Sequence, residues 1–368
     1  MRAFLLTLGT RGDLELFSGL GRELHRRGHD VVLGTSPFYA QRVLDAGIRF
    51  VSMGDGSQQR MVQVLRSLSQ ITDAAERTRQ YFQRWVQPQL AASMGKITDT
   101  GAASDYFVSN LKMVLRKNGV TMPGAFVTYD PPAAVGDLER YGSAKHAGRI
   151  IEVVAMNRDL IDPNGKWGEQ YHFTGFWQIP DHGIEIDEAL ARFVSSGRRP
   201  AVFTMGSMVM FDPDRFAQIA AESLRLAGQR GIIVGSWAGM DRAARQSDDL
   251  YWVQEAPYEW LFPGAACIVH HGGCGTVAAA IHAGVPSILL PQVLCQVDFA
   301  KVLIRERLAV GAFDIRTVGA AELADAIRAC VPDQAYRAAA VRWREQVRVD
   351  PGLSGAADLI EAHWNAVG

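Results

Sequence analysis

The chain has 368 residues, too many for one ordinary hydrophobic core, so we expect two domains. Apolar residues make up 48% of the sequence and charged residues 21%, a balance typical of globular proteins. The formal net charge is −1 and no long basic stretch occurs, which argues against nucleic acid or an anionic membrane as a partner.

The sequence favours a cytoplasmic protein without stable membrane insertion. The amino-terminal MRAFLLTLGTRGDLE has only a short apolar run before Arg11, and this run is typical of a first strand rather than a signal peptide. No apolar stretch reaches the ~18 residues that a membrane-spanning helix needs. The four cysteines show no CxxC spacing and no secretory context, which indicates reduced thiols.

Strand-like and helix-like segments alternate through the first 54 residues, and periodicity predicts strands at 2–9, 29–36 and 48–54 with helices at 14–28 and 37–47. Residues 60–100 are polar and helical, apart from an aromatic group near Tyr81. Short strands follow at 106–111 and 125–130. The stretch 162–183 is rich in Pro, Gly and aromatic residues, and we interpret it as the linker between the domains.

The alternation begins again after residue 187, where a short helix precedes the strand 200–207 and the helix 214–230. The remaining predicted elements are strands at 231–237, 250–256, 266–273 and 287–291, helices from 275 and from 296, and a last helix at 355–367. Parallel β-α-β units of this kind build open, doubly wound α/β sheets.

A glycine-rich turn, HHGGCGT at residues 270–276, joins a buried strand to an alanine-rich helix. Ligands of open α/β sheets bind at the carboxyl ends of strands, and a helix start there offers unpaired N–H groups and roughly half a positive charge. Gly272, Gly273, Gly275 and Thr276 can therefore cradle phosphate oxygens, with His271 as a further donor.

The alternative is that the histidines only end a strand and the glycines turn the chain, which we favour for His270. A Walker lysine is missing and the glycine spacing is not GxGxxG, so a diphosphate suits the turn better than a triphosphate.

Three segments resemble GT-B glycosyltransferases of family 1. Residues 270–300 are similar to the donor-site signature HHGGxGT, AGVPxxxxP and DQ. Residues 8–54 resemble the first β-α-β unit of the antibiotic (vancomycin-group) and sterol branches, and TMGSM at 204–208 resembles the turn that opens the second domain.

The resemblance implies two facing Rossmann-like, doubly wound domains. Residues 1–183 would bind the acceptor and residues 184–350 the nucleotide-sugar donor, and residues 351–368 would form a helix that packs back on the first domain.

The resemblance also assigns donor contacts. It places the donor diphosphate at His271, Gly275 and Thr276. Ser207 would lie near the phosphates, or its hydroxyl caps the next segment. Gln296 would bind hydroxyls of the sugar.

Two departures from the family pattern affect the donor site. Cys295 replaces the usual aspartate, and a thiol cannot hold a hydroxyl as a carboxylate does. Asp298 would bind the hydroxyl instead, or the donor is a deoxysugar that lacks this hydroxyl. The alternative for Asp298 is a place on a solvated helix face. Glu255 replaces the usual aromatic residue, which leaves the backbone of Ala256 for the base edge. Trp237, which packing explains equally well, or Tyr258 would offer a ring.

The resemblance makes Asp13 of the GTRGD segment the candidate general base. The alternative is that Thr10 and Asp13 form a capping box before an apolar run. A base from the poorly matching middle region also stays open. The acceptor would contact an apolar pocket of the first domain, unless these side chains only pack in its core: Tyr81, Trp85, Met113 and Tyr129.

We therefore expect an inverting, metal-independent glycosyltransferase with no cofactor beyond its nucleotide-sugar cosubstrate. It would transfer a sugar from a UDP- or dTDP-activated donor to a hydroxyl of a small hydrophobic natural product, as a monomer or homodimer. Two alternatives are a sugar-nucleotide epimerase on the same fold and a non-catalytic helper protein.

Overall fold

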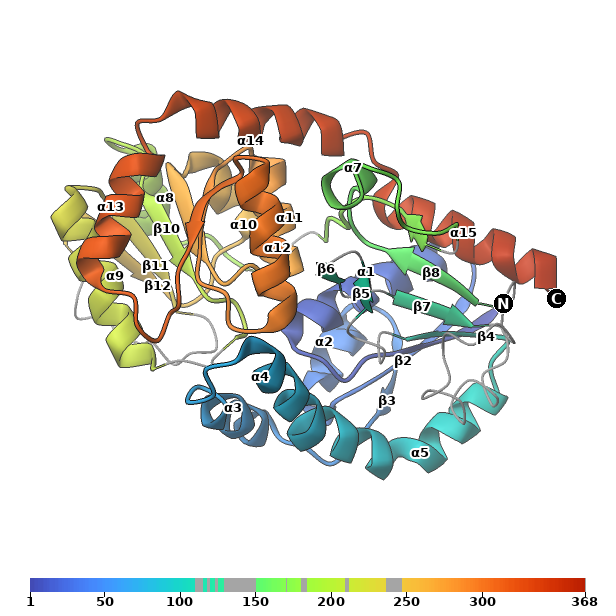
Figure 1. The fold of residues 1–368 in the computed structure, drawn as a ribbon. Helices are drawn as coiled ribbons and strands as arrows, with labels where there is room; N and C mark the ends of the chain where they lie inside the picture. Colours follow the sequence, from blue (N-terminus) through green and yellow to red (C-terminus); the bar gives the residue numbers. More distant parts are fainter. Residues whose placement is uncertain are drawn as a thin grey trace. The chain divides into compact units, whose positions relative to one another are not determined.

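The computed structural model describes residues 1–109, 115–117, 120–122, 125–128, 150–169, 171–179, 184–208, 212–235 and 247–367 (Figure 1). The chain divides into two compact α/β units. Unit 1 comprises Met1–Val64, Arg79–Ile179 and Asp350–Gly368, and unit 2 comprises Leu65–Thr78 and Pro180–Val349. The helical stretch Leu65–Thr78 therefore belongs to the second unit, although the sequence had placed it in the first domain.

The first 109 residues contain these elements: β1 (Arg2–Leu6), α1 (Arg11–Arg26), β2 (Asp30–Thr35), η1 (Pro37–Tyr39), α2 (Ala40–Asp45), β3 (Arg49–Ser52), α3 (Gln58–Ser67), α4 (Ala74–Tyr81), the π-helix η2 (Phe82–Val86), α5 (Gln87–Ala102) and β4 (Tyr106–Ser109). Unit 1 continues with β5 (Leu115–Lys117), β6 (Val120–Met122), β7 (Ala125–Thr128), β8 (Ile150–Val154), α7 (Arg158–Ile161), β9 (Tyr171–Phe173) and α15 (Gly352–Val367).

In the described part of unit 1, seven strands form one sheet in the order β3-β2-β1-β4-β7-β8-β9. The strands β3, β2, β1 and β4 are parallel, as expected from their β-α-β pattern. Strand β7 departs from that pattern, because it pairs antiparallel with both β4 and β8. The chain between β4 and β7 contains the β5–β6 hairpin, and a parallel return needs a crossover connection of about a dozen residues or more, usually with a helix.

The expectation of a linker at 162–183 is wrong for the described residues up to 179. This stretch contains β9, which pairs with β8 in the sheet of unit 1. Trp167 and Trp177 are buried, and the Trp167 ring makes edge contacts with Tyr171 and Phe173. The aromatic residues that suggested an irregular linker instead build an apolar cluster at the end of this sheet.

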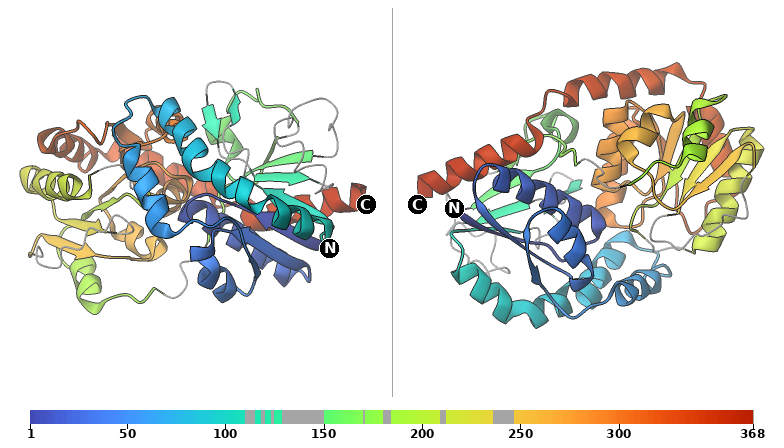
Figure 2. Two further views of the ribbon diagram at one scale, coloured as in Figure 1. Left: turned by 90° about the horizontal axis from the view of Figure 1, so that it is seen from below. Right: turned by 180° about the vertical axis from the view of Figure 1, so that it is seen from behind.

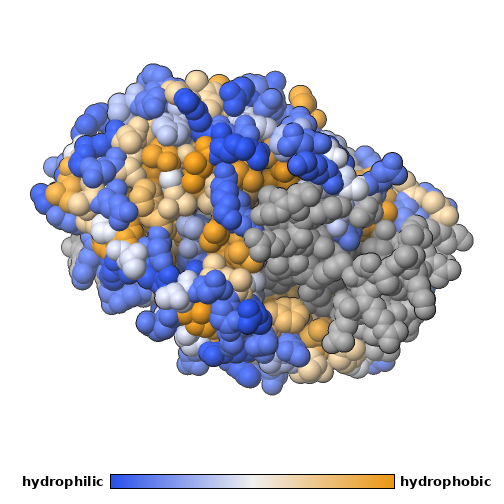
Figure 3. All heavy atoms as spheres, viewed as in Figure 1, coloured by the Kyte–Doolittle hydropathy of each residue, from blue (hydrophilic) through white to orange (hydrophobic). Residues whose placement is uncertain are grey.

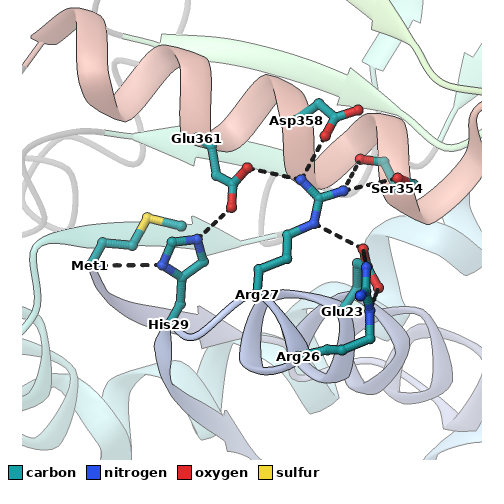
Figure 4. A network of polar contacts seen from close by, with 8 residues as sticks. All are labelled: Met1, Glu23, Arg26, Arg27, His29, Ser354, Asp358 and Glu361. Carbon is teal, nitrogen blue, oxygen red and sulfur yellow. Dashed lines mark hydrogen bonds and ion pairs between the residues drawn. The ribbon is translucent and has the colours of Figure 1, made fainter.

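The last helix, α15, lies along α1 within unit 1 (Figure 2). The Arg27 guanidinium connects them: it donates to Asp358 at 2.6 Å, to Glu361 at 2.8 Å and to the Ser354 hydroxyl at 2.9 Å (Figure 4). His29 is also 2.6 Å from Glu361. Half-buried charge pairs of this kind hold the end of the chain to the first strand–helix unit.

Unit 2 contains the following elements: α8 (Glu188–Ser195), β10 (Ala201–Thr204), α9 (Pro213–Ala227), β11 (Gly231–Val234), β12 (Leu250–Val253), α10 (Tyr258–Leu261), η6 (Phe262–Gly264), β13 (Cys267–His270), α11 (Cys274–Ala283), β14 (Ser287–Leu289), α12 (Leu294–Arg305), β15 (Ala309–Ala312), α13 (Ala320–Cys330) and α14 (Gln334–Val347). Its described strands form an all-parallel sheet in the order β12-β11-β10-β13-β14-β15. This is the doubly wound Rossmann order, with buried strands and helices on both faces.

The surface follows from this layering. On the face shown in Figure 3, hydrophilic side chains cover most of the helices of unit 2, and apolar side chains lie in small patches between them. Among the described residues, no helix combines the length and the apolar character that crossing a bilayer requires.

Candidate active site

The strand order of unit 2 reverses between β10 and β13. From β10 the chain continues through α9 to β11 on one side, and from β13 it continues through α11 to β14 on the other. Right-handed crossovers then place α9 and α11 on opposite faces of the sheet and leave a crevice outside the carboxyl ends of β10 and β13. The turn at Gly206 and the glycine-rich turn 271–276 both follow these two strand ends.

His270 and His271 have different environments, although they are adjacent in sequence. His270 ends β13 and is fully buried, with Nε2 at 3.0 Å from the Ser287 hydroxyl and Nδ1 accepting from the Gly272 N–H at 3.1 Å. Both of its ring nitrogens are therefore occupied, so His270 supports the turn, as we had favoured. Burial, together with His271, lowers the pKa of His270 to about 3.

The His271 ring lies between two glycines. A Cβ on Gly206 would come within 3.0 Å of His271 Cε1, and a Cβ on Gly273 within 2.3 Å of His271 Nε2. Only 6% of the residue is exposed, and burial lowers the pKa of its imidazole to about 4. No protein partner of Nδ1 is found within the described ranges. The ring is therefore neutral at pH 7. It packs against Gly206 and Gly273 so closely that a side chain at either position would displace it.

The turn after His271 leads into the open end of α11. Gly272 has φ +84°, a conformation that favours glycine, and Gly273 is the N-cap residue with no side-chain cap. Gly275 is exposed, and no described atom lies within 4 Å of the position that a methyl group on it would take, whereas Thr276 is buried. The first turn of α11 carries no acidic residue, so its partial positive charge is available to an anion.

Gln296 lies beside this turn, at the start of α12. A Cβ on Gly272 would be 3.7 Å from the Gln296 Cβ. The Gln296 Oε1 accepts from the backbone N–H of Gln292 at 2.7 Å and of Val293 at 3.4 Å. Its amide group therefore has only N–H groups to offer to a ligand.

Asp298, two residues further along α12, is not on a solvated helix face. It is 1% exposed, and its Oδ1 accepts from Lys301 at 2.7 Å. The expectation of solvation is therefore wrong, because α12 turns this carboxylate into the unit. Cys295, the residue before Gln296, is half-buried.

The remaining donor-site candidates are spread along the sheet edge. Ser207 is half-buried in the turn after β10, next to Gly206, which has φ +54°. The Ala256 side chain belongs to the core, so only its backbone is suited to contact a base. The Tyr258 hydroxyl is 2.6 Å from the Thr204 hydroxyl, and the Tyr258 ring stacks on that of Phe262. Trp237 lies outside the described residues.

In unit 1, Asp13 occupies the first turn of α1. Its Oδ2 accepts from the backbone N–H of Thr10, the N-cap residue, at 2.8 Å. This is the capping geometry that the sequence left as an alternative to catalysis, and one does not exclude the other, because a carboxylate has lone pairs for several donors. Burial raises the pKa of Tyr81, and the nearby negative charge of Asp13 raises it further.

The expected acceptor residues differ in their surroundings. Tyr81 is 6% exposed, and no hydrogen-bond partner for its hydroxyl is found within the described ranges. Trp85 is fully buried and donates from Nε1 to the Leu8 carbonyl at 3.2 Å, so it serves core packing and offers no surface to an acceptor. Met113 and Tyr129 lie outside the described residues. In the parts of the chain that the structure covers, no three His, Cys, Asp or Glu side chains gather as a metal site would require.

Sequence reasoning missed two features of this region. Gly206 supports His271, and its signal was the positive-φ turn typical of a glycine after a strand. Arg77 and Thr78 contact Gln292 and Leu294 at the start of α12. The sequence gave no signal of these contacts, because they join segments more than 200 residues apart.

Comparisons with known proteins identify the fold and the class of enzyme. Residues 3–112 match the glycosyltransferase family 28 N-terminal domain, and residues 238–362 match the C-terminal domain of the erythromycin biosynthesis protein CIII-like family. With two Rossmann-like units and these matches, the chain is a nucleotide-sugar glycosyltransferase of the GT-B fold.

Its relatives include antibiotic and sterol glycosyltransferases. The chain is 27% identical to the O-mycaminosyltylonolide 6-deoxyallosyltransferase of Streptomyces fradiae, over 98% of this chain and 97% of that protein. It is 22% identical to a sterol 3-beta-glucosyltransferase of Arabidopsis thaliana, over 99% of this chain and 66% of that protein. The chain thus spans about two thirds of the plant enzyme's length.

Solved structures share the fold along the whole chain. The calicheamicin glycosyltransferase CalG4 has a TM-score of 0.69 at 17% identity and covers 100% of this chain and 99% of its own. The glycosyltransferase VinC, solved in complex with dTDP, has a TM-score of 0.60 at 17% identity and covers 100% of both chains.

Proposed function

We propose that this enzyme transfers a sugar, specifically a deoxysugar, from a dTDP- or UDP-activated donor to a hydroxyl of a small hydrophobic natural product. The anomeric configuration would invert, and neither a metal nor a cofactor would take part. Two comparisons support this choice: a relative transfers 6-deoxyallose to a tylonolide, and a structural neighbour was solved with dTDP.

One observation carries the proposal, namely the open amino-terminus of α11 next to His271. The Gly273 N-cap provides no side chain, so the N–H groups of the first turn can bind an anion. A neutral imidazole adds one N–H hydrogen bond. The departing diphosphate carries the developing negative charge of the reaction, and preorganised donors of this kind stabilise it.

The sugar subsite fits a donor with few hydroxyls. Gln296 uses its Oε1 on the backbone and would bind a sugar oxygen through its amide N–H groups alone. Cys295 gives only a weak hydrogen bond where the family has a carboxylate. A deoxysugar requires fewer acceptors from the protein than glucose does.

Asp13 is the proposed general base. It would take the proton from the acceptor hydroxyl while the acceptor oxygen bonds to the anomeric carbon. The bond from that carbon to the diphosphate breaks, its electron pair leaves with the diphosphate, and attack from the opposite side inverts the configuration. The Thr10 N–H holds one carboxylate oxygen, which fixes the direction of the other.

Calorimetric titration with dTDP and with UDP tests the donor site. We expect the wild type to bind at least one of them and His271→Ala to bind it about tenfold more weakly, since a hydrogen bond to a charged group contributes ~1.5–3 kcal/mol. His282→Ala is the control, because His282 lies in the last turn of the same helix. Equal affinity of wild type and His271→Ala would remove the phosphate role of the turn.

Product analysis tests the reaction itself. Donor and apolar acceptor together should yield an inverted glycoside at a rate that EDTA leaves unchanged. Conversion of the donor alone into an epimer would instead establish the epimerase alternative.

A further inference from the structure

The stretch Leu65–Thr78 runs from the end of α3 into α4 and belongs to unit 2, not to the unit that surrounds it in sequence. Two of its side chains, those of Arg77 and Thr78, bond to the backbone of Gln292 and Leu294 around the start of α12. These are the residues that lead directly into Gln296.

Arg77 is the centre of this contact. It is 5% exposed, and its guanidinium donates to three backbone carbonyls: Gln292 at 2.5 Å, Ile71 at 2.5 Å and Thr72 at 2.9 Å. Burying a cation costs free energy unless its donors are satisfied, and here the carbonyls satisfy them. Arg316 of unit 2 donates to the same Ile71 and Thr72 carbonyls at 3.1 and 3.3 Å. The turn 71–72 is therefore held from two sides.

Thr78 completes the contact one residue later. Its hydroxyl accepts from the Leu294 N–H, the first residue of α12, at 3.1 Å. The N-cap position of α12 is Val293, whose side chain cannot accept a hydrogen bond. A threonine more than 200 positions earlier in the sequence therefore supplies the capping oxygen that the helix itself lacks.

The loop before Gln296 is thus fixed on both sides. Gln296 binds the N–H groups of Gln292 and Val293, while Arg77 binds the Gln292 carbonyl and Thr78 binds the Leu294 N–H. Four polar groups of three consecutive residues have partners, and two of those partners come from the stretch Leu65–Thr78.

We propose that Arg77 and Thr78 are positioning residues for the donor sugar: they hold the loop 292–294 and so place the Gln296 amide for the sugar. This inference rests on the proposed function, which assigns the sugar to Gln296. The diphosphate cradle at 271–276 belongs to another turn and does not depend on these contacts. Losing them should therefore weaken recognition of the sugar and leave recognition of the nucleoside diphosphate intact.

The experiment compares two ligands on each variant. Affinities for dTDP-glucose and dTDP, or for the UDP pair if the wild type prefers it, are measured by calorimetry. For Arg77→Ala and Thr78→Val we expect the dTDP affinity to stay within about twofold and the dTDP-glucose affinity to fall about tenfold, the loss of one to two hydrogen bonds. In turnover the donor KM should rise by a similar factor.

Matched variants separate positioning from loss of folding. Thr78→Ser keeps the capping oxygen and should restore wild-type affinity. Gln70→Ala removes an exposed side chain of the same stretch, whose amide contacts the neighbouring Ser69 hydroxyl, and should leave both affinities unchanged. Hydrogen exchange of the Leu294 amide in the unliganded protein should accelerate in Thr78→Val and not in Thr78→Ser. Retained dTDP affinity shows that unit 2 is folded in each variant.

The outcomes are distinguishable. If the wild type binds neither nucleotide nor sugar nucleotide, the proposed function fails. If the wild type binds both and the two affinities change together, or not at all, in Arg77→Ala and Thr78→Val, the positioning role is refuted while the proposed function stands.

Discussion

The two units share a strand–turn–helix arrangement, but only one of the two helix starts carries an acidic side chain. Each has a strand, a glycine-containing turn and a helix that begins where parallel strands end: β1 to α1 in unit 1, and β13 to α11 in unit 2. The helix start of α1 already holds a carboxylate, because Asp13 accepts from the Thr10 N–H. The helix start of α11 has a glycine cap and no acidic residue.

Under the proposed function, this difference would separate the two chemical tasks of glycosyl transfer. The helix start that holds the protein's own carboxylate would present the base, and the open helix start beside a neutral imidazole would receive the anion. In both arrangements a glycine lies so close to the functional side chain that no Cβ fits between them. A Cβ on Gly9 would lie 2.1 Å from Asp13 Oδ2, and a Cβ on Gly273 would lie 2.3 Å from His271 Nε2.

The largest effect should come from Asp13→Asn. The amide can keep the hydrogen bond from the Thr10 N–H but cannot take a proton, so we expect turnover to fall ~10²- to 10⁴-fold with unchanged dTDP affinity. Rates with saturating donor and acceptor measure this. Turnover at the wild-type level would reduce Asp13 to a helix cap.

Gly9→Ala should act on the same carboxylate without replacing it. The new methyl group would displace Asp13, and we expect turnover to fall by about tenfold or more, as a misplaced catalytic group does. Gly12→Ala is the matched control, since the nearest atom to its methyl position, the Thr10 hydroxyl, is 3.9 Å away. If both alanine variants were equally active, the position of Asp13 would not matter for the reaction.

Gly273→Ala and Gly275→Ala should separate stability from ligand binding in unit 2. The first would force the His271 ring to move and should lower the free energy of unfolding by ~1–3 kcal/mol. The second has open space and should leave stability unchanged while its methyl group hinders the diphosphate and lowers dTDP affinity several-fold. Denaturant titration and calorimetry measure the two effects, and unaltered dTDP binding by Gly275→Ala would place the diphosphate elsewhere.

Acid should destabilise the open turn through its histidines. Burial holds the pKa of His271 at about 4, below the ~6.5 of an unfolded chain. The unfolded state therefore binds more protons between these values, and stability falls as pH falls from ~6.5 towards 4. We expect His271 alone to cost about 2 kcal/mol of unfolding free energy at about pH 5 relative to neutral pH.

Comparing wild type with His271→Asn at about pH 7.5 and about pH 5 isolates this contribution. The asparagine does not titrate, so the variant should lose less stability on acidification. An identical loss in both proteins would mean that His271 is not buried as described.

Much of the fold could be predicted from local signals. Short apolar runs bounded by turn residues marked the strands β1, β2, β10 and β13, and glycine spacing marked the turn 271–276 as a candidate site, because both signals depend on neighbours in the sequence. The direction of β7 was not predictable in this way. It depends on the chain between β4 and β7, which forms a hairpin where a parallel strand would need a crossover. The aromatic stretch up to residue 179 was misinterpreted for a similar reason, because the pairing of β9 with β8 makes it part of a sheet.

For this protein, the sequence by itself determined the strand–helix alternation of residues 1–54 and of much of unit 2, the two Rossmann-like units and the residue types of the glycine-rich turn 271–276. Only the tertiary structure decided that His270 binds Ser287 while His271 stands between two glycines, and that Arg77 and Thr78 fix the loop before Gln296. The spacing of apolar residues and the residue types that form turns can be read from consecutive positions in the sequence. Which side chain satisfies a carbonyl 215 positions away depends on how the chain folds back on itself.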